Sequence, residues 1–153
     1  MGSECEIPYQ EVKNTALRLL GRREHSEHEI REKLCLRGAS GEQVDEVIEY
    51  LKDGNYLSNR RYAEMIIRRR ASQGYGLRKI SYELAGKGVS RGDIQDSLKS
   101  LDFDWCEVAA SMLRKKYRNY SEKPTDIQKQ QRFLQQRGFE FDEIKAAMSV
   151  FRS

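Results

Sequence analysis

The sequence predicts an all-α protein made of three tandem three-helix repeats, about nine helices in an elongated, curved array. Two observations predict this class. The 153 residues include only two prolines, and their β-branched residues do not alternate in runs as they do in strands. Similar residues also recur every 50 positions, which is the signature of a repeat protein. A unit of this size buries little apolar surface alone, so neighbouring units should pack together.

Four positions define the 50-residue period. They hold a leucine, a glycine, a branched apolar residue and a large apolar residue, in the sets Leu34/Leu84/Leu134, Gly38/Gly88/Gly138, Val44/Ile94/Ile144 and Leu51/Leu101/Phe151. Each glycine should end a short helix in the left-handed conformation, and the last two positions share one face of the following helix. The third repeat carries about four extra residues near Asn119 to Pro124. The predicted domains are 1–56, 57–103 and 104–153.

The helices are expected at residues 9–23, 26–37, 42–53, 59–72, 77–87, 91–101, 105–118, 125–137 and 141–152. Capping patterns support several starts, because an acceptor side chain stands three residues before an acidic or amide side chain. These patterns are Ser26-x-x-Glu29, Ser40-x-x-Gln43, Ser90-x-x-Asp93, Thr125-x-x-Gln128 and, in a looser form, Asp104-x-x-Glu107. Pro124 fits a first helical turn.

Composition favours a protein with much surface per residue. Hydrophobic residues make up 38% and charged residues 34% of the chain. No apolar run is long enough to span a bilayer, and no secretion signal is visible, which predicts a cytoplasmic protein without a membrane role. The three cysteines, Cys5, Cys35 and Cys106, are odd in number and far apart, so we expect free thiols in a reducing compartment.

Basic charge is concentrated in the middle of the chain. Residues 60–91 contain nine basic and two acidic side chains, a net charge of +7, whereas the whole chain carries +4. Residues 1–59 contain eight basic and twelve acidic side chains, a net charge of −4. Such concentration is typical of a protein that binds an anionic partner, most often nucleic acid, although an ordinary solvated helix face is the alternative.

The candidate binding residues lie in two basic segments. Arg70, Arg78 and Lys79 surround Tyr75, which we expect to be exposed between two helices, where it could stack on an unpaired base while the cations bind phosphates. Tyr75 packed on the core is the alternative. The second segment belongs to the third repeat. The full set of candidates is Arg61, Arg68, Arg69, Arg70, Tyr75, Arg78, Lys79, Lys87, Arg114, Lys115 and Lys116.

No arrangement of residues suggests catalysis, a metal or a cofactor. His25 and His28 could share a helix face, but no cysteine or acidic ligand stands at a suitable spacing, so we expect surface or capping histidines. There is no Cys-x-x-Cys pair and no phosphate-binding loop. The sequence therefore favours a non-enzymatic protein.

The chain resembles the regulatory protein RecX family of bacteria over nearly its whole length. The resemblance depends on Gly54-x-Tyr56-Leu57, Arg61-Tyr62-Ala63, Ile67-x-x-Arg70, Gly74-Tyr75-Gly76, Ile80-x-x-Glu83-Leu84, Lys87-Gly88-Val89 and, at the ends, on His25-Ser26-Glu27, Leu34, Asp104-Trp105-Cys106 and Gln131-Arg132-Phe133-Leu134-x-x-Arg137-Gly138-Phe139. The family usually has an acidic residue after Tyr-Leu, whereas this chain has Ser58-Asn59 there.

This resemblance implies a modulator, usually an inhibitor, of the RecA recombinase. Such proteins consist of three three-helix repeats, bind the groove of the recombinase filament on single-stranded DNA, and reduce filament extension, ATP hydrolysis and strand exchange. We expect a monomer that binds the RecA filament and single-stranded DNA, with weak binding to duplex DNA. The alternatives are a stand-alone DNA-binding module that uses the helix at 77–87, and a helical scaffold with no nucleic-acid role.

Overall fold

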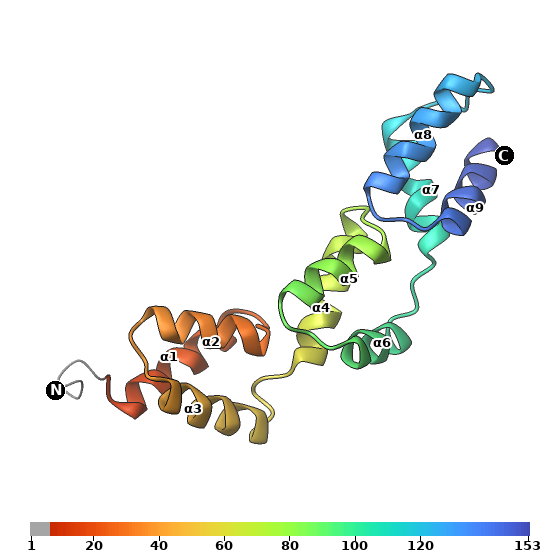
Figure 1. The fold of residues 1–153 in the computed structure, drawn as a ribbon. Coiled ribbons are helices and arrows are strands. Elements are labelled where there is room, and N and C mark those ends of the chain that lie inside the picture. The colour runs from red at the N-terminus through yellow and green to blue at the C-terminus, as the bar shows by residue number, and fades with distance from the viewer. Residues whose placement is uncertain (1–6) are drawn as a thin grey trace. The chain divides into compact units, whose positions relative to one another are not determined.

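The structure, a computed structural model, describes residues 7–153, and this part holds nine helices and no strand (Figure 1). The helices are α1 (Tyr9–Arg22), α2 (Glu27–Leu36), α3 (Gly41–Asp53), α4 (Asn59–Ser72), α5 (Leu77–Gly86), α6 (Arg91–Ser100), α7 (Trp105–Lys116), α8 (Pro124–Gln136) and α9 (Phe141–Arg152). Every predicted helix is present, and the all-α class is confirmed. No helix in the described residues is long and apolar enough to cross a membrane.

Four of the five predicted helix caps are present. Ser26 and Ser40 form complete capping boxes with Glu29 and Gln43, and the side chains of Ser90 and Asp104 accept from the backbone N–H three residues later. The fifth prediction, Thr125, is wrong. Helix α8 begins at Pro124, whose ring already has the helical φ and whose missing N–H needs no acceptor, so Thr125 lies within the first turn.

The residues that define the 50-residue period have the expected roles. Gly38, Gly88 and Gly138 have φ values of +95°, +78° and +98°, so each ends its helix in the left-handed conformation. Leu34, Leu84 and Leu134 are all buried. The connection between α7 and α8, residues 117–123, is longer than that between α4 and α5, and it lies where the extra residues of the third repeat were expected.

The chain forms two compact units: Met1–Ala63 with Gly86–Ser97, described from residue 7, and Glu64–Ala85 with Leu98–Ser153. In the first unit, α1, α2 and α3 enclose a core that includes Ala16, Ile30, Val44 and Leu51. In the second unit, α7 packs most extensively against α9. Both units take part of the middle repeat, so the boundaries 1–56, 57–103 and 104–153 remain a prediction.

The core of the second unit combines small and large side chains. Ala109 and Ala110 on α7 and Ala147 on α9 are completely buried, which lets the two helices approach closely. Leu134 and Phe139 fill the space beside them. The left-handed Gly138 and this core together fix the end of α8, beside which the surface described next lies.

Candidate nucleic-acid interface

The second compact unit contains nine of the eleven candidate binding residues. Arg68, Arg69 and Arg70 lie on α4, Tyr75 lies in the turn before α5, and Arg78 and Lys79 lie in the first turn of α5. Arg114, Lys115 and Lys116 form the last turn of α7. The other two candidates, Arg61 and Lys87, belong to the first unit.

Two turns of the second unit bind each other through their backbones. The N–H of Gly76 donates to the carbonyl of Arg137 over 2.8 Å, and the N–H of Arg78 donates to the carbonyl of Gly138 over 3.1 Å. A Cβ atom on Gly76 would lie 2.5 Å from the carbonyl carbon of Gly138, a distance that real side chains do not reach. Glycine at position 76 therefore allows the turn before α5 to dock against the turn after α8.

A row of alternating cations and aromatic rings extends from this contact. Lys79 and Arg137 lie 5.0 Å and 4.2 Å from the centre of the Tyr75 ring. Arg137 also lies 5.7 Å from the Phe133 ring, over which Lys116 lies at 4.5 Å. We call Lys79, Tyr75, Arg137, Phe133 and Lys116 the cation–aromatic row. It brings the two predicted basic segments together, because Lys79 comes from α5 and Lys116 from α7.

Tyr75 is half-buried, so the expectation of an exposed ring is wrong. Arg137 lies against the ring and is held there by hydrogen bonds to the carbonyls of Gly74, at 3.0 Å, and Gln73, at 2.5 Å. Arg137 and Phe133 are not among the candidates that the charge pattern of the sequence predicts. The 50-residue period gave a usable signal, since Arg137 follows Arg37 and Lys87 in the same register.

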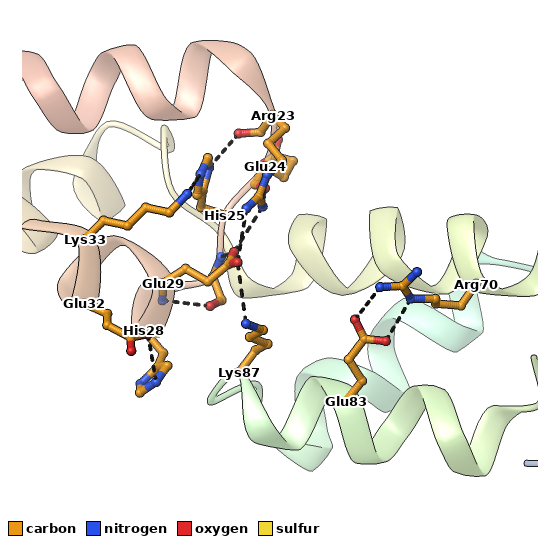
Figure 2. A network of polar contacts seen from close by, with 11 residues as sticks. Arg23, Glu24, His25, His28, Glu29, Glu32, Lys33, Arg70, Glu83 and Lys87 are labelled. Carbon is orange, nitrogen blue, oxygen red and sulfur yellow. Dashed lines mark hydrogen bonds and ion pairs between the residues drawn. The ribbon is translucent and has the colours of Figure 1, made fainter.

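Arg70 holds the carboxylate of Glu83 with two hydrogen bonds, from Nε at 2.9 Å and Nη2 at 3.0 Å (Figure 2). Glu83 is the only acidic residue of α5. A pocket of about 270 Å³ lies here, lined by Arg70, Tyr75, Lys79, Ile80 and Glu83. The bidentate pair offsets the negative charge of Glu83 beside the basic first turn of α5.

The cations best placed to meet an external anion are the exposed ones. Arg68, Arg69, Arg78, Lys79, Arg114, Lys115 and Lys116 all have this property. Within this group, Arg114 bonds Glu107 over 2.8 Å, between two largely exposed side chains. Exposed cations on neighbouring helices can track a phosphate backbone without a defined pocket.

In the first unit, Lys87 belongs to a network centred on the buried carboxylate of Glu29 (Figure 2). Arg23 donates to both oxygens of Glu29 at 3.1 and 3.2 Å, the N–H of Ser26 donates at 3.1 Å, and Lys87 Nζ lies 4.0 Å away. Burial alone would raise the pKa of Glu29, but the bonds from Arg23 and Ser26 outweigh burial, so the pKa is lowered.

Arg61 is likewise bound within the first unit. Its Nε donates to Glu24 at 3.0 Å, and its other nitrogens donate to the side chain and carbonyl of Asn55 at 2.9 and 2.8 Å. Arg61 and Lys87 thus have acidic or carbonyl partners within the first unit.

His25 is buried, so the expectation of a surface or capping histidine is wrong for this residue. Its Nε2 lies 3.1 Å from Lys33 Nζ, which can only donate, so Nε2 accepts and Nδ1–H donates to the carbonyl of Arg23 over 3.0 Å. Burial lowers the pKa of His25, and the charges of Arg23 and Lys33 add to this effect. His28 is exposed and lies 3.7 Å from Glu32.

No group of three metal-binding side chains is present in the described part of the chain. Cys35 and Cys106 are free thiols, and burial raises the pKa of Cys106. Cys5, the third predicted free thiol, lies outside the described residues.

The fold and this candidate interface define a helical repeat protein that presents cations and aromatic rings on its second compact unit. Family models described as the first, second and third three-helix domains of RecX match residues 13–51, 58–98 and 102–148. The chain belongs to the RecX family.

Relatives and solved structures agree over most of the chain. The chain is 36% identical over 143 residues to "Regulatory protein RecX" of Vibrio vulnificus strain CMCP6, covering 93% of this chain and 94% of the relative. It is 38% identical over 134 residues to the protein of that name from Haemophilus influenzae strain PittEE, covering 86% and 88%. The crystal structure of RecX from Lactobacillus salivarius has the same fold, with a TM-score of 0.80, 23% identity and coverage of 94% and 96%.

Proposed function

We propose that this protein is a non-enzymatic regulator of the RecA recombinase. It binds the groove of the RecA filament on single-stranded DNA and inhibits it, which reduces filament extension, ATP hydrolysis and strand exchange. It acts as a cytoplasmic monomer without a cofactor, and it binds duplex DNA only weakly. The proposal is supported by membership in a family whose relatives are named regulatory proteins.

One observation of the structure carries the proposal. The second compact unit carries exposed cations on α4, α5 and α7 together with the cation–aromatic row, while Arg70 offsets the charge of Glu83. A filament on single-stranded DNA offers both phosphates and acidic protein surface, and a surface with many separate cations can meet either. We therefore expect the contacts to be distributed and to bridge neighbouring recombinase subunits.

The stand-alone DNA-binding alternative fits the structure less well. A recognition helix enters a groove with its N-terminal residues. In α5 the corresponding turn is already occupied, because the N–H of Arg78 bonds the carbonyl of Gly138 and a Cβ at Gly138 would lie 2.5 Å from Lys79 Cβ. This close backbone contact leaves side chains, rather than the end of the helix, available to a partner.

The test is RecA ATP hydrolysis on single-stranded DNA while the protein is titrated in. The wild type should inhibit at well below one copy per recombinase subunit. A variant with Arg68→Ala, Arg69→Ala and Arg78→Ala should inhibit much more weakly, because it removes exposed cations and leaves the Arg70–Glu83 pair intact.

The matched control replaces three exposed cations of the first unit, Arg18→Ala, Arg22→Ala and Arg37→Ala, and should inhibit like the wild type. Circular dichroism checks that both variants keep their helices. Absence of inhibition by excess wild-type protein would refute the regulatory proposal. Equal inhibition by all three proteins would refute the assignment of the surface.

A further inference from the structure

Tyr82 is the most exposed large aromatic residue in the described chain, with 84% of its surface accessible. Single exposed apolar residues are common on protein surfaces, so exposure alone carries no function. The position of Tyr82 is more informative. It follows Arg78 by four residues and Lys79 by three on α5, so the three side chains share one helix face.

This face of α5 is cationic. Arg78 and Lys79 are both exposed, and the helix's only carboxylate, Glu83, is bound by Arg70 through two hydrogen bonds. The backbone of the first turn is fixed, because Arg78 N–H bonds the carbonyl of Gly138. A rigid helix therefore presents an accessible ring one turn away from two cations.

The Tyr75 ring is less suited to receive a base, since Arg137 lies 4.2 Å from its centre and Lys79 lies 5.0 Å from it. Tyr82 is the neighbouring aromatic whose ring is open to solvent. Aromatic rings that accompany cations are the usual means of binding single strands, because every unpaired base has a π-face that can stack on them. Bases inside a duplex are already stacked on one another and are not available in this way.

We infer that Tyr82 stacks on an unpaired base of single-stranded DNA, while Arg78 and Lys79 bind the phosphates next to that base. This inference rests on the proposed function, because it names the residue through which the regulator would contact the DNA strand of the filament. It assigns different roles to neighbouring side chains, and an experiment can separate them. The Tyr82 ring contributes to the binding free energy independently of salt, whereas the contribution of Arg78 and Lys79 decreases as salt rises.

The experiment measures fluorescence anisotropy of a labelled oligo-dT strand with the full-length protein at several salt concentrations. Tyr82→Ala should weaken binding about five-fold or more while leaving the salt dependence unchanged. Tyr82→Phe should bind like the wild type because it keeps the ring. Arg78→Ala should reduce the log–log salt slope by roughly 0.7.

An abasic strand of the same length separates stacking from phosphate binding. It carries the same phosphates, so the wild type and Tyr82→Ala should bind it equally. The matched control is Leu36→Ala, which removes a side chain that is 83% exposed on the first unit and should change nothing. Equal loss of affinity for the abasic and the base-containing strand, or an unchanged affinity of Tyr82→Ala for oligo-dT, would overturn the inference.

The RecA hydrolysis assay, run with the same variants, distinguishes the two proposals. If the wild type inhibits RecA but Tyr82→Ala binds the oligo-dT strand and inhibits unchanged, the stacking role fails and the regulatory function stands. If Tyr82→Ala loses base-dependent binding but the wild type does not inhibit RecA, the regulatory function fails and the stacking role stands.

Discussion

The guanidinium of Arg137 lies 4.2 Å from the centre of the Tyr75 ring, and this contact joins the end of α8 to the turn before α5. Arg137 also donates to the carbonyls of Gln73 and Gly74 in that turn. The residue thus binds both the ring and the backbone of one short segment. Arg137 therefore stabilises the cation–aromatic row through intramolecular contacts and is not one of the exposed cations available to an external anion.

The Arg137–Tyr75 contact should contribute measurably to stability. We expect Arg137→Ala and Tyr75→Ala each to lower the free energy of unfolding, and the double variant to lose less than the sum, with a coupling of about 1 kcal/mol. Tyr75→Phe should behave like the wild type because the ring is kept. Chemical denaturation followed by circular dichroism measures all four, and additive losses would show that ring and cation do not interact.

Gly138 should be intolerant of any side chain. Its φ is +98°, and a Cβ atom there would lie 2.5 Å from Cβ and 2.7 Å from the backbone nitrogen of Lys79. We expect Gly138→Ala to cost about 2 kcal/mol or more, through backbone strain and loss of the turn contact.

The control for this position is Gly21→Ala in α1, where a Cβ would meet nothing within 4 Å. Since alanine is the better helix former, Gly21→Ala should stabilise by about 0.5–1 kcal/mol. Thermal melting compares the two variants. Similar changes in melting temperature at positions 21 and 138 would contradict the prediction that only Gly138 is constrained by its φ and its contact with Lys79.

The buried carboxylate of Glu29 should contribute more to the free energy of unfolding than an exposed carboxylate does. Glu29→Ala would leave the guanidinium of Arg23 without its bidentate acceptor and remove the carboxylate half of the capping box, so we expect a loss of about 2–3 kcal/mol. Glu32→Ala, on the same helix but largely exposed, should change stability by less than about 0.5 kcal/mol. Denaturant midpoints of the two variants measure these losses of stability. Comparable losses would show that burial of Glu29 does not increase its contribution to the free energy of unfolding.

Stability should fall as the pH is lowered, in two steps. The pKa of His25 is depressed below its ordinary value of 6.5, so the unfolded chain takes up a proton first and stability is lost as the pH falls from about 6.5 towards the folded-state pKa. The pKa of Glu29 is depressed below 4.5, so its contribution is present above pH 4.5 and is lost as the pH falls through the folded-state pKa.

His25→Gln should flatten the first step, and His28→Gln, which alters an exposed side chain, should leave it in place. Melting temperatures measured from pH 7.5 to pH 5 test this. If the melting temperature changes with pH equally in the wild type and in His25→Gln, groups other than His25 cause the loss of stability.

The helices could be predicted from the sequence because their signals are local. Ser26 and Ser40 stand three residues before side chains that complete the cap, and Gly38, Gly88 and Gly138 occupy positions that need a positive φ. Thr125 matched the same pattern but failed, since Pro124 starts the helix one residue earlier. Here two local signals competed, and the proline decided the outcome.

The candidate interface could be predicted only in part, because its geometry depends on contacts between distant segments. Charge alone pointed to Arg68, Arg78 and Lys79, which are indeed exposed. Charge could not show that Lys87 would lie near the buried Glu29, or that Arg137 would cover Tyr75. Whether a cation faces solvent or an internal partner is decided by packing, and a single sequence does not encode that in local spacing.

The periodic glycines and their neighbours also bear on how the chain avoids mispairing while it folds. Positions 29 and 79 are equivalent in the 50-residue period, yet one is an acid near Lys87 and the other a cation beside Gly138. If the Lys87 turn of one molecule docked on α5 of a second copy of the chain, it would meet Lys79, a like charge, instead of Glu29. Tandem units of similar sequence are prone to domain swapping. The change of sign at this one position therefore disfavours the exchange of the Lys87 turn between two copies of the chain.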